Sequence, residues 1–600
     1  MGELLGNKRR THYCGEISEA LVGQELVLMG WVQTKREKKS VIFIDLRDRT
    51  GIAQIVVEAD HQPEAFDKAK SSRGEYVLCA TGKLVERASK NPKIPTGGVE
   101  LIVEELKILS EAHVPPIHID DEDQAGEKLT LKYRYLELRK PRIQNILRMR
   151  HEVLQTTHRY MNERGFLYID TPLLYKPTPE GAREYLVPSS VNKGKFYALP
   201  QSPQVFKQIL MVGGADKYYQ VAKCFRDEAL RADRQPEFSQ IDIEMSFIDE
   251  EDIYELIEGL VYNIFKDVKG MEIQRPFRRM CYDEAMRRFG SDKPDLRFGF
   301  ELVELTDLFV DTEFAPFKAS TEKGRSIRAV NIDGHEAAFS SKDMKKLGEF
   351  VKVYGAKGLA HIRVKDGEIQ SSLSNVLKEE EIAGIVQRMN AKAGDLILII
   401  ADKNNEVFNG LSALRGECAR KLGLVDPNHY EILWVNNMPL YEYKEEEDKY
   451  YAAHHPFTSP KDESLEILTT DRDACRAKAY DLVINGYESA GGSIRIHDFD
   501  LQKRFFEALG ISEEDMKDKF GFLLEALSYG TPPHGGIALG LDRLIMLLAG
   551  TDNIKDVIAF PKNQDAKCLM TGSPVEVPTK TLSDLTIALK EQPKSDVQGE

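Results

Sequence analysis

Short apolar runs separated by turn residues make up the chain from residue 12 to about residue 110. Their period-2 alternation predicts strands rather than helices. The expected strands are Glu25–Val32, Val41–Arg47, Ile52–Glu58, Tyr76–Val85 and Val99–Ile108, with a helix at Pro63–Ser71. Five strands and one helix in a segment of this length fit an OB-fold barrel, whose exposed strands bind single-stranded nucleic acid.

A basic run follows the first of these strands, at Lys35, Arg36, Lys38 and Lys39, and we expect it to form a loop. Phe43 lies on the next strand. Positive charge beside an aromatic ring suits bases that are turned out of their stack. A phenylalanine within an apolar strand is, however, more often part of the core, so both interpretations stay open.

An apolar run at Tyr219–Phe225 and a strict alternation at Ile241–Met245 predict two further strands. Residues 226–237, between them, carry arginines among carboxylates. Guanidinium groups bind phosphate oxygens and carboxylates hold metal ions, so this segment suits a polyphosphate ligand. On charge pattern alone, a solvated hairpin held by ion pairs is the alternative.

A helix is expected at Ile143–Asn162, after a hinge at residues 111–142 that contains paired prolines and acidic residues. A second helix begins within residues 201–208. In that helix Gln204 and Lys207 lie three residues apart and therefore share a face.

Residues from about 296 to 425 interrupt the pattern, because strand-like pieces there alternate with polar helices. The expected strands are Ser326–Ile332, Leu359–Val364 and Leu396–Ala401, and the expected helices are Lys342–Tyr354 and Lys378–Ala391. The strongest catalytic candidates lie on either side of this segment, so we interpret it as a separate inserted domain.

Two acids, Asp481 and Glu488, flank a strand and a loop nearer the end of the chain. Their carboxylate oxygens could hold a magnesium ion. Glycines precede Leu541, but they do not form a dinucleotide-binding fingerprint. They do let a ligand approach the backbone closely, and Arg543 at the start of the following helix could meet that ligand.

Composition excludes several classes of protein. The formal net charge of −15 argues against a protein that coats nucleic acid indiscriminately. The seven cysteines are never spaced as CxxC, which indicates reduced thiols in a cytoplasmic protein without a thiolate zinc site. The pair His454-His455 is weak evidence for a metal, because neighbouring residues on a strand point to opposite faces. No apolar run could span a bilayer, and the polar N-terminus lacks a signal-peptide core.

Three stretches, in this order along the chain, resemble the three signature motifs of the class II aminoacyl-tRNA synthetases. They are Gly165-Phe166 with Thr171-Pro172, Phe225-Arg226-Asp227-Glu228 with its following strand, and Gly540-Leu541-Asp542-Arg543. Each pattern alone is weak, but the ordered set is specific. QSPQVFKQ at 201–208, GGSIRIH at 491–497 and the long insertion are similar to those of the bacterial aspartyl-tRNA synthetases. The resemblance covers nearly the whole chain except its last few dozen residues.

The resemblance implies an α+β multidomain fold: an N-terminal OB-fold β-barrel that reads the anticodon, an antiparallel-sheet catalytic domain of class II type, and an inserted α/β domain. The implied boundaries are 1–111 for the barrel, 112–142 for the hinge, 143–295 and 427–565 for the two catalytic parts, 296–426 for the insertion and 566–600 for a C-terminal extension. A cytoplasmic homodimer, formed partly through the first motif and without a membrane partner, is also implied.

The implied activity is that of an aspartate–tRNA ligase. L-Aspartate and ATP form aspartyl-adenylate and pyrophosphate, and the aspartyl group then passes to the 3′ end of tRNA(Asp). No protein nucleophile is needed, so positioning and charge neutralisation carry the catalysis. Arg226 and Arg543 are the expected catalytic residues. The expected ATP-binding residues are Arg226, Asp227, Glu228, Gln235, Glu488, Gly540, Leu541, Asp542 and Arg543, with Mg²⁺ on Asp481 and Glu488.

The resemblance places the aspartate pocket at Glu180, Gln204, Lys207, Arg226, Asp242, His454 and Arg495. Arg495 can bind the side-chain carboxylate as a bidentate pair, and Lys207 adds a second cation. A neutral amide would leave these buried cations unpaired, which explains the selection of aspartate over asparagine. Anticodon contacts are implied at Arg36, Phe43, Gln54 and Glu100.

Two alternatives stay open. The first is that the enzyme charges tRNA(Asn) as well as tRNA(Asp). The basic run with Lys38 bears on this choice, because bacterial relatives more often have an arginine-rich run there, but it does not decide whether one tRNA or both are charged. The other alternative is a synthetase paralogue that keeps the barrel and has lost catalysis. This alternative is disfavoured by the joint presence of Arg226, Arg543, Asp481, Glu488, Lys207 and Arg495, because the residues of a site that has lost its function are free to change.

Overall fold

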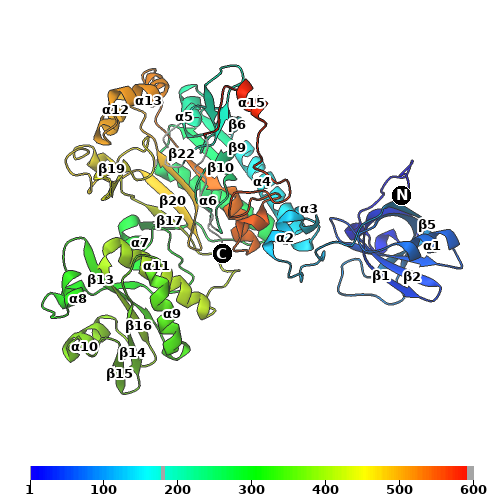
Figure 1. Ribbon diagram of the computed structural model, residues 1–600, viewed down its shortest axis with the longest axis horizontal. Helices are drawn as coiled ribbons and strands as arrows, with labels where there is room; N and C mark the ends of the chain where they lie inside the picture. Colours follow the sequence, from blue (N-terminus) through cyan, green and yellow to red (C-terminus); the bar gives the residue numbers. More distant parts are fainter. Residues whose placement is uncertain (1, 178–182, 231, 591–600) are drawn as a thin grey trace. The chain divides into compact units, whose positions relative to one another are not determined.

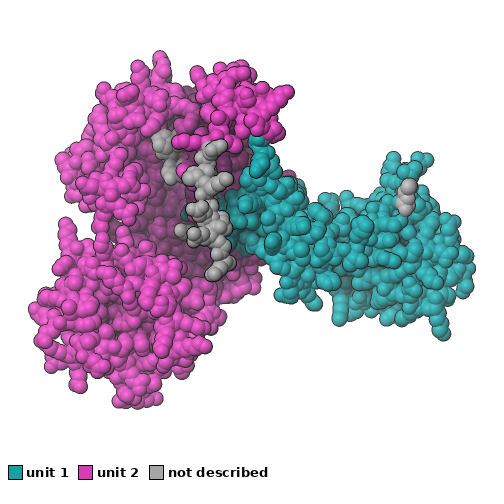
Figure 2. Space-filling model, in the orientation of Figure 1, with its two compact units in different colours: residues 1–151, 230–235, 553–577 teal, residues 152–229, 236–552, 578–600 magenta. Residues whose placement is uncertain are grey.

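The structure, a computed structural model, describes residues 2–177, 183–230 and 232–590. It divides into two compact units (Figure 2). The first contains residues 1–151, 230–235 and 553–577, and the second contains residues 152–229, 236–552 and 578–600. Among the described residues, none of the helices is both long enough and apolar enough to cross a membrane.

The first unit contains a closed five-stranded barrel with the strand order β1-β2-β3-β5-β4 (Figure 1). Its elements are β1 (Glu25–Lys38), β2 (Val41–Arg47), β3 (Ile52–Glu58), α1 (Pro63–Ser71), β4 (Val77–Glu86) and β5 (Val99–Ser110). They match the predicted elements with one exception. The basic run at residues 35–38 was expected in a loop, but it continues β1, because Arg36 pairs with Phe43 and the ladder extends to Lys38 opposite Val41.

The interior of the barrel is filled by every second residue of each strand. On β2, Ile42, Ile44 and Leu46 are fully buried. The period-2 geometry therefore directs Phe43 and Asp45 to the outer surface, where both are half-buried. The interpretation of Phe43 as a core residue is wrong, because its strand neighbours already supply the core.

The hinge after the barrel contains α2 (Glu127–Lys132) and α3 (Arg134–Glu137). Arg139, just beyond α3, forms an ion pair with Glu75 at 2.8 Å, and Arg47 of β2 pairs with the same carboxylate at 2.8 Å. The hinge is therefore tied to the barrel through a buried glutamate that two arginines share.

The second unit is built on an eight-stranded sheet with the order β11-β17-β20-β21-β22-β10-β9-β6. The strands are β6 (Leu167–Tyr168), β9 (Lys217–Phe225), β10 (Glu237–Ser246), β11 (Arg278–Cys281), β17 (Ile432–Asn436), β20 (Ala479–Ile484), β21 (Tyr487–Ile494) and β22 (His534–Gly540). The six central strands pair antiparallel, and only the outermost pairs β11·β17 and β6·β9 are parallel. The antiparallel-sheet fold expected from the sequence is confirmed, with β9 and β10 as the predicted pair.

Helices and small hairpins complete this part of the chain. The helices are α4 (Pro141–Glu163), α5 (Gln204–Val212), α6 (Glu250–Ile264), α7 (Tyr282–Phe289), α12 (Phe499–Ala508), α13 (Glu513–Leu527), α14 (Leu541–Ala549) and α15 (Thr579–Asp584). In one hairpin β7 (Leu186–Pro188) pairs with β8 (Phe196–Ala198), and in the other β18 (Tyr441–Lys444) pairs with β19 (Lys449–Ala452). Both α5 and α14 contact β10. These two helices supply several of the candidate side chains.

The inserted segment forms its own five-stranded antiparallel sheet, of order β12-β13-β16-β14-β15. Its elements are β12 (Leu302–Glu304), α8 (Ala315–Ala319), β13 (Arg325–Ile332), α9 (Ser341–Lys352), β14 (Ala360–Lys365), β15 (Glu368–Ser371), α10 (Glu379–Arg388), β16 (Leu396–Lys403) and α11 (Asn404–Lys421). The apolar run of β16 is buried on both faces, because alternate residues belong to two separate hydrophobic clusters.

Candidate active site

Asp242 and Asp481 lie on the same face of the central sheet, in one row across its strands. Asp242 of β10 pairs with Ala538, Ala538 pairs with Gly491, and Gly491 pairs with Asp481 of β20. Directly paired residues in an antiparallel sheet point to the same face. With neighbouring strands about 4.8 Å apart, the two carboxylates stand on one surface, roughly 14 Å apart in strand spacing.

Glu244 stands on the same face, two residues along β10 from Asp242. Its carboxylate accepts hydrogen bonds from Arg495, at 3.0 Å from Nε and 3.2 Å from Nη2, and it lies 3.2 Å from Lys207 Nζ. Lys207 also lies 2.7 Å from Asp242. All four side chains are at most 4% exposed. Two buried cations are therefore held by two buried carboxylates.

Burial and pairing act in opposite directions on the two acids. Burial alone would raise the pKa of Glu244, but Arg495 and Lys207 outweigh it and hold that pKa below its ordinary value. Burial raises the pKa of Asp242 above its ordinary value, although Lys207 opposes the shift. Glu244 is thus the firmly ionised member, and it aligns both cations.

The two cations keep donor capacity beyond these bonds. A guanidinium has five N–H groups and an ammonium has three. Arg495 uses two on Glu244 and one, at 2.7 Å, on Ser493 Oγ. Lys207 has two close contacts, with Asp242 and Glu244. Among the described residues, two N–H groups of Arg495 and one of Lys207 make no further bond, so the two cations can donate hydrogen bonds to one more carboxylate.

Glycines form the floor of this face. A Cβ atom at Gly536, opposite Glu244 on β22, would lie 1.9 Å from Glu244 Oε2. A Cβ atom at Gly491 would lie 2.8 Å from Asp481 Oδ1 and 3.6 Å from Glu488 Oε1. Only glycine leaves room for these carboxylates.

On α5, Gln204 lies one turn from Lys207, as the sequence predicted. Gln204 is buried and donates to Gln208 Oε1 at 3.2 Å, and Gln208 Nε2 lies 3.3 Å from His534 Nε2. His534 Nδ1 in turn lies 2.8 Å from the carbonyl oxygen of Pro532. This chain of hydrogen bonds fixes the helix face that carries Lys207.

Asp481 and Glu488 meet because of a β-bulge. The register between β20 and β21 shifts at Leu482/Val483, and the bulge turns Glu488 toward the side of Asp481. Burial, with the charge of Glu488, raises the pKa of Asp481 well above its ordinary value. Burial would also raise the pKa of Glu488, but Lys293 and Arg543 outweigh it and lower that pKa.

Two converging carboxylates have the donor chemistry that Mg²⁺ requires. Among the described residues, no group of three or more His, Cys, Asp or Glu side chains could hold a metal ion. Protein carboxylates alone would therefore leave a metal here under-coordinated. Mg²⁺ commonly takes one or two carboxylates and completes its shell with substrate phosphates, so the pair fits a metal that arrives with a nucleotide.

The arginines of the second and third motifs are both placed near this face. The Arg226 guanidinium lies 5.1 Å above the ring of Phe238, and the Arg226 backbone N–H donates to Pro236 at 2.9 Å. Arg543, in the first turn of α14, donates to the backbone oxygen of Glu488. Arg543 therefore lies beside the acid pair.

Their motif neighbours have contacts within the fold. Asp542 accepts from the backbone N–H of Ser239 at 2.7 Å and Leu541 is fully buried, so both attach α14 to the sheet. Gly540 is the N-cap residue of α14. The Asp227 carboxylate lies 3.5 Å from Arg183, and Glu228 follows Asp227 in the connection to β10. Their assignment to ATP binding stays a prediction.

Three predicted residues remain: Gln235, Glu180 and His454. In the first unit, the Gln235 amide bonds the Lys562 backbone, accepting at 2.8 Å and donating at 3.1 Å. Glu180 lies outside the described residues. His454 is exposed and follows β19 rather than lying on a strand, so the strand-based argument about the histidine pair was wrong.

The histidine pair is divided between the two ends of the site. Burial lowers the pKa of the His455 ring well below its ordinary value. The charges that act on His454 include Glu488 and Lys293, whereas Arg495 and Lys207 act on His455. His455 is therefore the histidine beside the cation pair, and His454 belongs to the acid pair.

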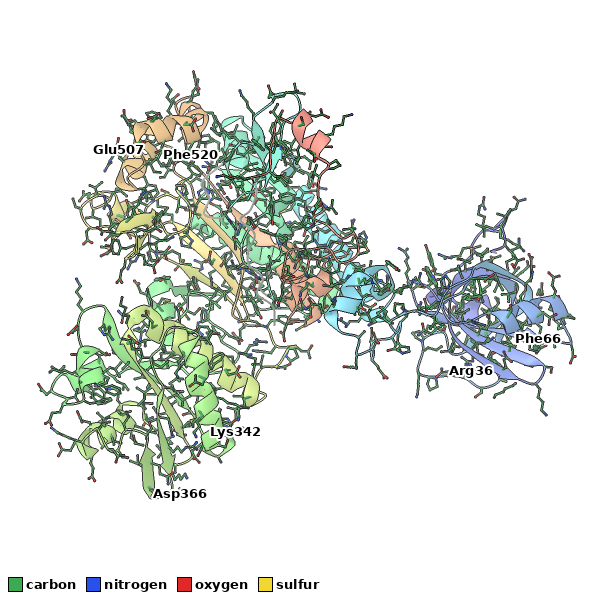
Figure 3. The ribbon with its side chains drawn as sticks, viewed as in Figure 1. Arg36, Phe66, Lys342, Asp366, Glu507 and Phe520 are labelled. Atoms are coloured by element: carbon green, nitrogen blue, oxygen red, sulfur yellow. The ribbon has the colours of Figure 1, made fainter. Side chains whose placement is uncertain are left out.

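On the barrel, the four predicted anticodon residues lie together on the outer face. Arg36, which Figure 3 labels, pairs across the strands with Phe43 and donates to Gln54 Oε1 at 3.1 Å. Gln54 donates to Glu100 at 2.6 Å. Sequence reasoning missed Arg87, which donates to Gln54 at 2.8 Å. A ring beside a polar network is suited to stacking one base and bonding the edge of another.

Comparison with known families agrees with this architecture. Residues 126–564 match the tRNA synthetases class II (D, K and N), and residues 26–109 match the OB-fold nucleic acid binding domain family. The chain belongs to the class II tRNA synthetases of this D, K and N group. It is thus an aminoacyl-tRNA synthetase, a ligase that acts on ATP, an amino acid and tRNA.

Several curated relatives resemble the chain over almost its full length. The aspartate–tRNA(Asp/Asn) ligase of Caldanaerobacter subterraneus subsp. tengcongensis is 52% identical over 591 residues, covering 98% of this chain and 100% of its own. The aspartate–tRNA ligase of Macrococcus caseolyticus is 52% identical, covering 97% and 98%. That of Clostridium botulinum is 51% identical over 599 residues and covers both chains completely.

Solved structures show the same fold at greater distance. Asparaginyl-tRNA synthetase from Pyrococcus horikoshii, complexed with asparaginyl-adenylate, has a TM-score of 0.58 at 20% identity and covers 92% of this chain and 98% of its own. The Entamoeba histolytica asparaginyl-tRNA synthetase has a TM-score of 0.56 at 19% identity, with the same coverage. At these identities the likeness concerns the fold alone.

Proposed function

We propose that this synthetase is an aspartate–tRNA ligase. The observation that carries the proposal is the buried group of Lys207, Arg495 and Glu244, with three N–H groups left for one more carboxylate. An amino acid with an anionic side chain completes this group. Asparagine or lysine would leave a buried cation unpaired or add a third one, which costs several kcal/mol. The names of the relatives described above support the same substrate.

In the first reaction, an α-carboxylate oxygen of aspartate attacks the α-phosphorus of ATP and pyrophosphate leaves. Arg226 holds the α-phosphate and Arg543 the distal phosphates, so charge that builds on phosphorus is neutralised by fixed guanidinium groups. Asp481 and Glu488 would hold Mg²⁺, which supplies further charge neutralisation at the phosphates when it is bound.

In the second reaction, the 3′-terminal hydroxyl of the tRNA takes the aspartyl group from the adenylate and AMP leaves. Arg36, Phe43, Gln54 and Glu100 contact the anticodon, with Arg87 as a further member of the network. Binding energy from the barrel raises the affinity for the whole tRNA without touching the reacting atoms.

We propose that the chain works in the cytoplasm as a homodimer, and the exposed side chains of the first motif support the dimer. Leu167 and Leu174 are 54% and 53% exposed, and Tyr168 and Leu173 are 44% and 45% exposed. Large apolar side chains gathered on one short segment mark a protein interface. A second copy of the chain, paired through this segment, would bury them.

The proposed function is tested by charging two purified tRNAs with radiolabelled aspartate. Aspartylation of tRNA(Asp) is expected. Aspartylation of tRNA(Asn) as well would identify the Asp/Asn form, which several relatives carry in their names. Transfer of asparagine or lysine in place of aspartate to either tRNA would contradict the proposal.

A further inference from the structure

The connection from α7 into the inserted domain brings a lysine to the acid pair. Lys293 Nζ lies 3.2 Å from Glu488 Oε2 and 3.6 Å from Asp292 Oδ2. Lys293 and Glu488 are 195 residues apart in the chain, so the fold alone creates this contact. A cation therefore already lies against one of the two carboxylates that would hold Mg²⁺.

The inserted domain holds this connection in place. Arg415 of α11 is 2% exposed and donates to three carbonyl oxygens of the connection: Phe300 at 2.6 Å, Gly299 at 2.9 Å and Asp295 at 3.4 Å. Burial lowers the pKa of Arg415 to about 10, which leaves it charged at neutral pH. Lys293 is thus carried by an anchored segment rather than by a free surface loop.

The same connection packs against the turn between the two strands that carry the acids. Gly486, in that turn, has a φ of +83°, and a Cβ atom there would lie 3.0 Å from Asp295 Cβ. This close approach fixes the distance between the connection and the strands β20 and β21. Asp481, Glu488 and Lys293 are therefore held in one frame.

We propose that Lys293 is a positioning residue that occupies Glu488 in the free enzyme and competes with the divalent cation for its carboxylate. The inference rests on the proposed metal site. Nζ contacts Oε2 of this carboxylate, and a metal ion bound to the same carboxylate would be repelled by the ammonium charge, so metal binding favours displacement of the lysine from Glu488. Phosphate charge that enters with ATP compensates for this repulsion. The lysine thus makes the site accept metal together with the nucleotide rather than alone.

The test is Mn²⁺ binding to the full-length enzyme without ATP, measured from the electron paramagnetic resonance signal of free Mn²⁺. Lys293→Gln keeps a hydrogen-bond donor and removes the charge. It should bind Mn²⁺ about tenfold more tightly than the wild type, because a repelling unit charge near the site is gone. Lys293→Arg keeps the charge and should bind as the wild type does.

Lys461→Met is the matched control. It removes a lysine that lies 3.5 Å from Glu250 in the same unit, and it should leave Mn²⁺ affinity unchanged. A merely structural role for Lys293 would weaken Mn²⁺ binding in Lys293→Gln. Unchanged or weaker binding by that variant overturns the inference while the metal site stands. If neither enzyme binds Mn²⁺, with or without ATP, both the inference and the proposed metal site fail.

Discussion

Glu244 and Arg495 form a buried, two-pronged ion pair, with Nε–Oε1 at 3.0 Å and Nη2–Oε2 at 3.2 Å. Lys207 shares the same carboxylate at 3.2 Å. A carboxylate between two cations orients both before any substrate arrives. In the proposed aspartate pocket, the substrate carboxylate would meet donors that are already placed, so less binding energy would be spent on ordering them.

Replacing Glu244 by glutamine should destabilise the protein. Arg495 would lose its only carboxylate partner within 4 Å among the described residues, and Lys207 would keep Asp242 alone. Breaking a buried ion pair on one side costs about 3–5 kcal/mol. Chemical denaturation of Glu244→Gln against the wild type measures this loss. A difference below about 1 kcal/mol, the usual value of an exposed pair, would contradict a structural role for Glu244.

The same variant should change how stability depends on pH. Arg495 and Lys207 lower the folded-state pKa of Glu244 below 4.5, its unfolded value. A lowered pKa means that the ionised group stabilises the fold above pH 4.5 and that this stabilisation is lost as pH falls through the folded pKa. Melting temperatures between pH 6 and pH 3 should therefore fall less steeply in Glu244→Gln. Parallel curves would show that Glu244 does not contribute.

Gly536→Ala should damage the site through Glu244. The new Cβ atom would lie 1.9 Å from Glu244 Oε2, so the carboxylate must move and take its cations with it. We expect aspartate-dependent ATP–pyrophosphate exchange to fall about 100-fold or more, because misplacement by about 1 Å has that effect. Gly521→Ala on α13, where the nearest atom would be Lys517 Cγ at 3.8 Å, is the control and should exchange normally. Normal exchange by Gly536→Ala would refute this packing.

Phe43→Ala should weaken tRNA charging and spare the first reaction. Loss of a stacked base costs about 1–3 kcal/mol, so KM for tRNA(Asp) should rise about tenfold or more. ATP–pyrophosphate exchange needs no tRNA and serves as the internal control. A parallel fall of both activities would show that the ring acts on the fold and not on the anticodon.

Much of the fold could be predicted from the local pattern of apolar and polar residues, because the alternation that marks each strand is contained in the residues of that strand. The limits of β2, β3 and α1 agree with the predicted ranges to the residue. The run at residues 35–38 was misplaced because pairing with β2 extended β1 beyond its apolar part. Tertiary pairing overrode the local polarity there.

Only part of the site could be predicted from the sequence. Asp242 and Glu244 are two apart on one strand, so period 2 alone places Glu244 beside Asp242, and that signal was present but unused. Lys293 and Arg87 had no such signal. Lys293 contacts Glu488 across 195 residues, and Arg87 contacts Gln54 across 33, and no periodicity within a segment encodes contacts of that kind.

The most direct measurement of the central claim is ATP–pyrophosphate exchange with L-aspartate and with L-asparagine, for the wild type and for Arg495→Leu. The wild type should favour aspartate by about 1,000-fold or more, because an amide leaves the buried cations unpaired. Arg495→Leu should lose aspartate-dependent exchange and remain folded by circular dichroism. Near-normal exchange by a folded Arg495→Leu enzyme, or equal exchange with both amino acids in the wild type, would contradict the account.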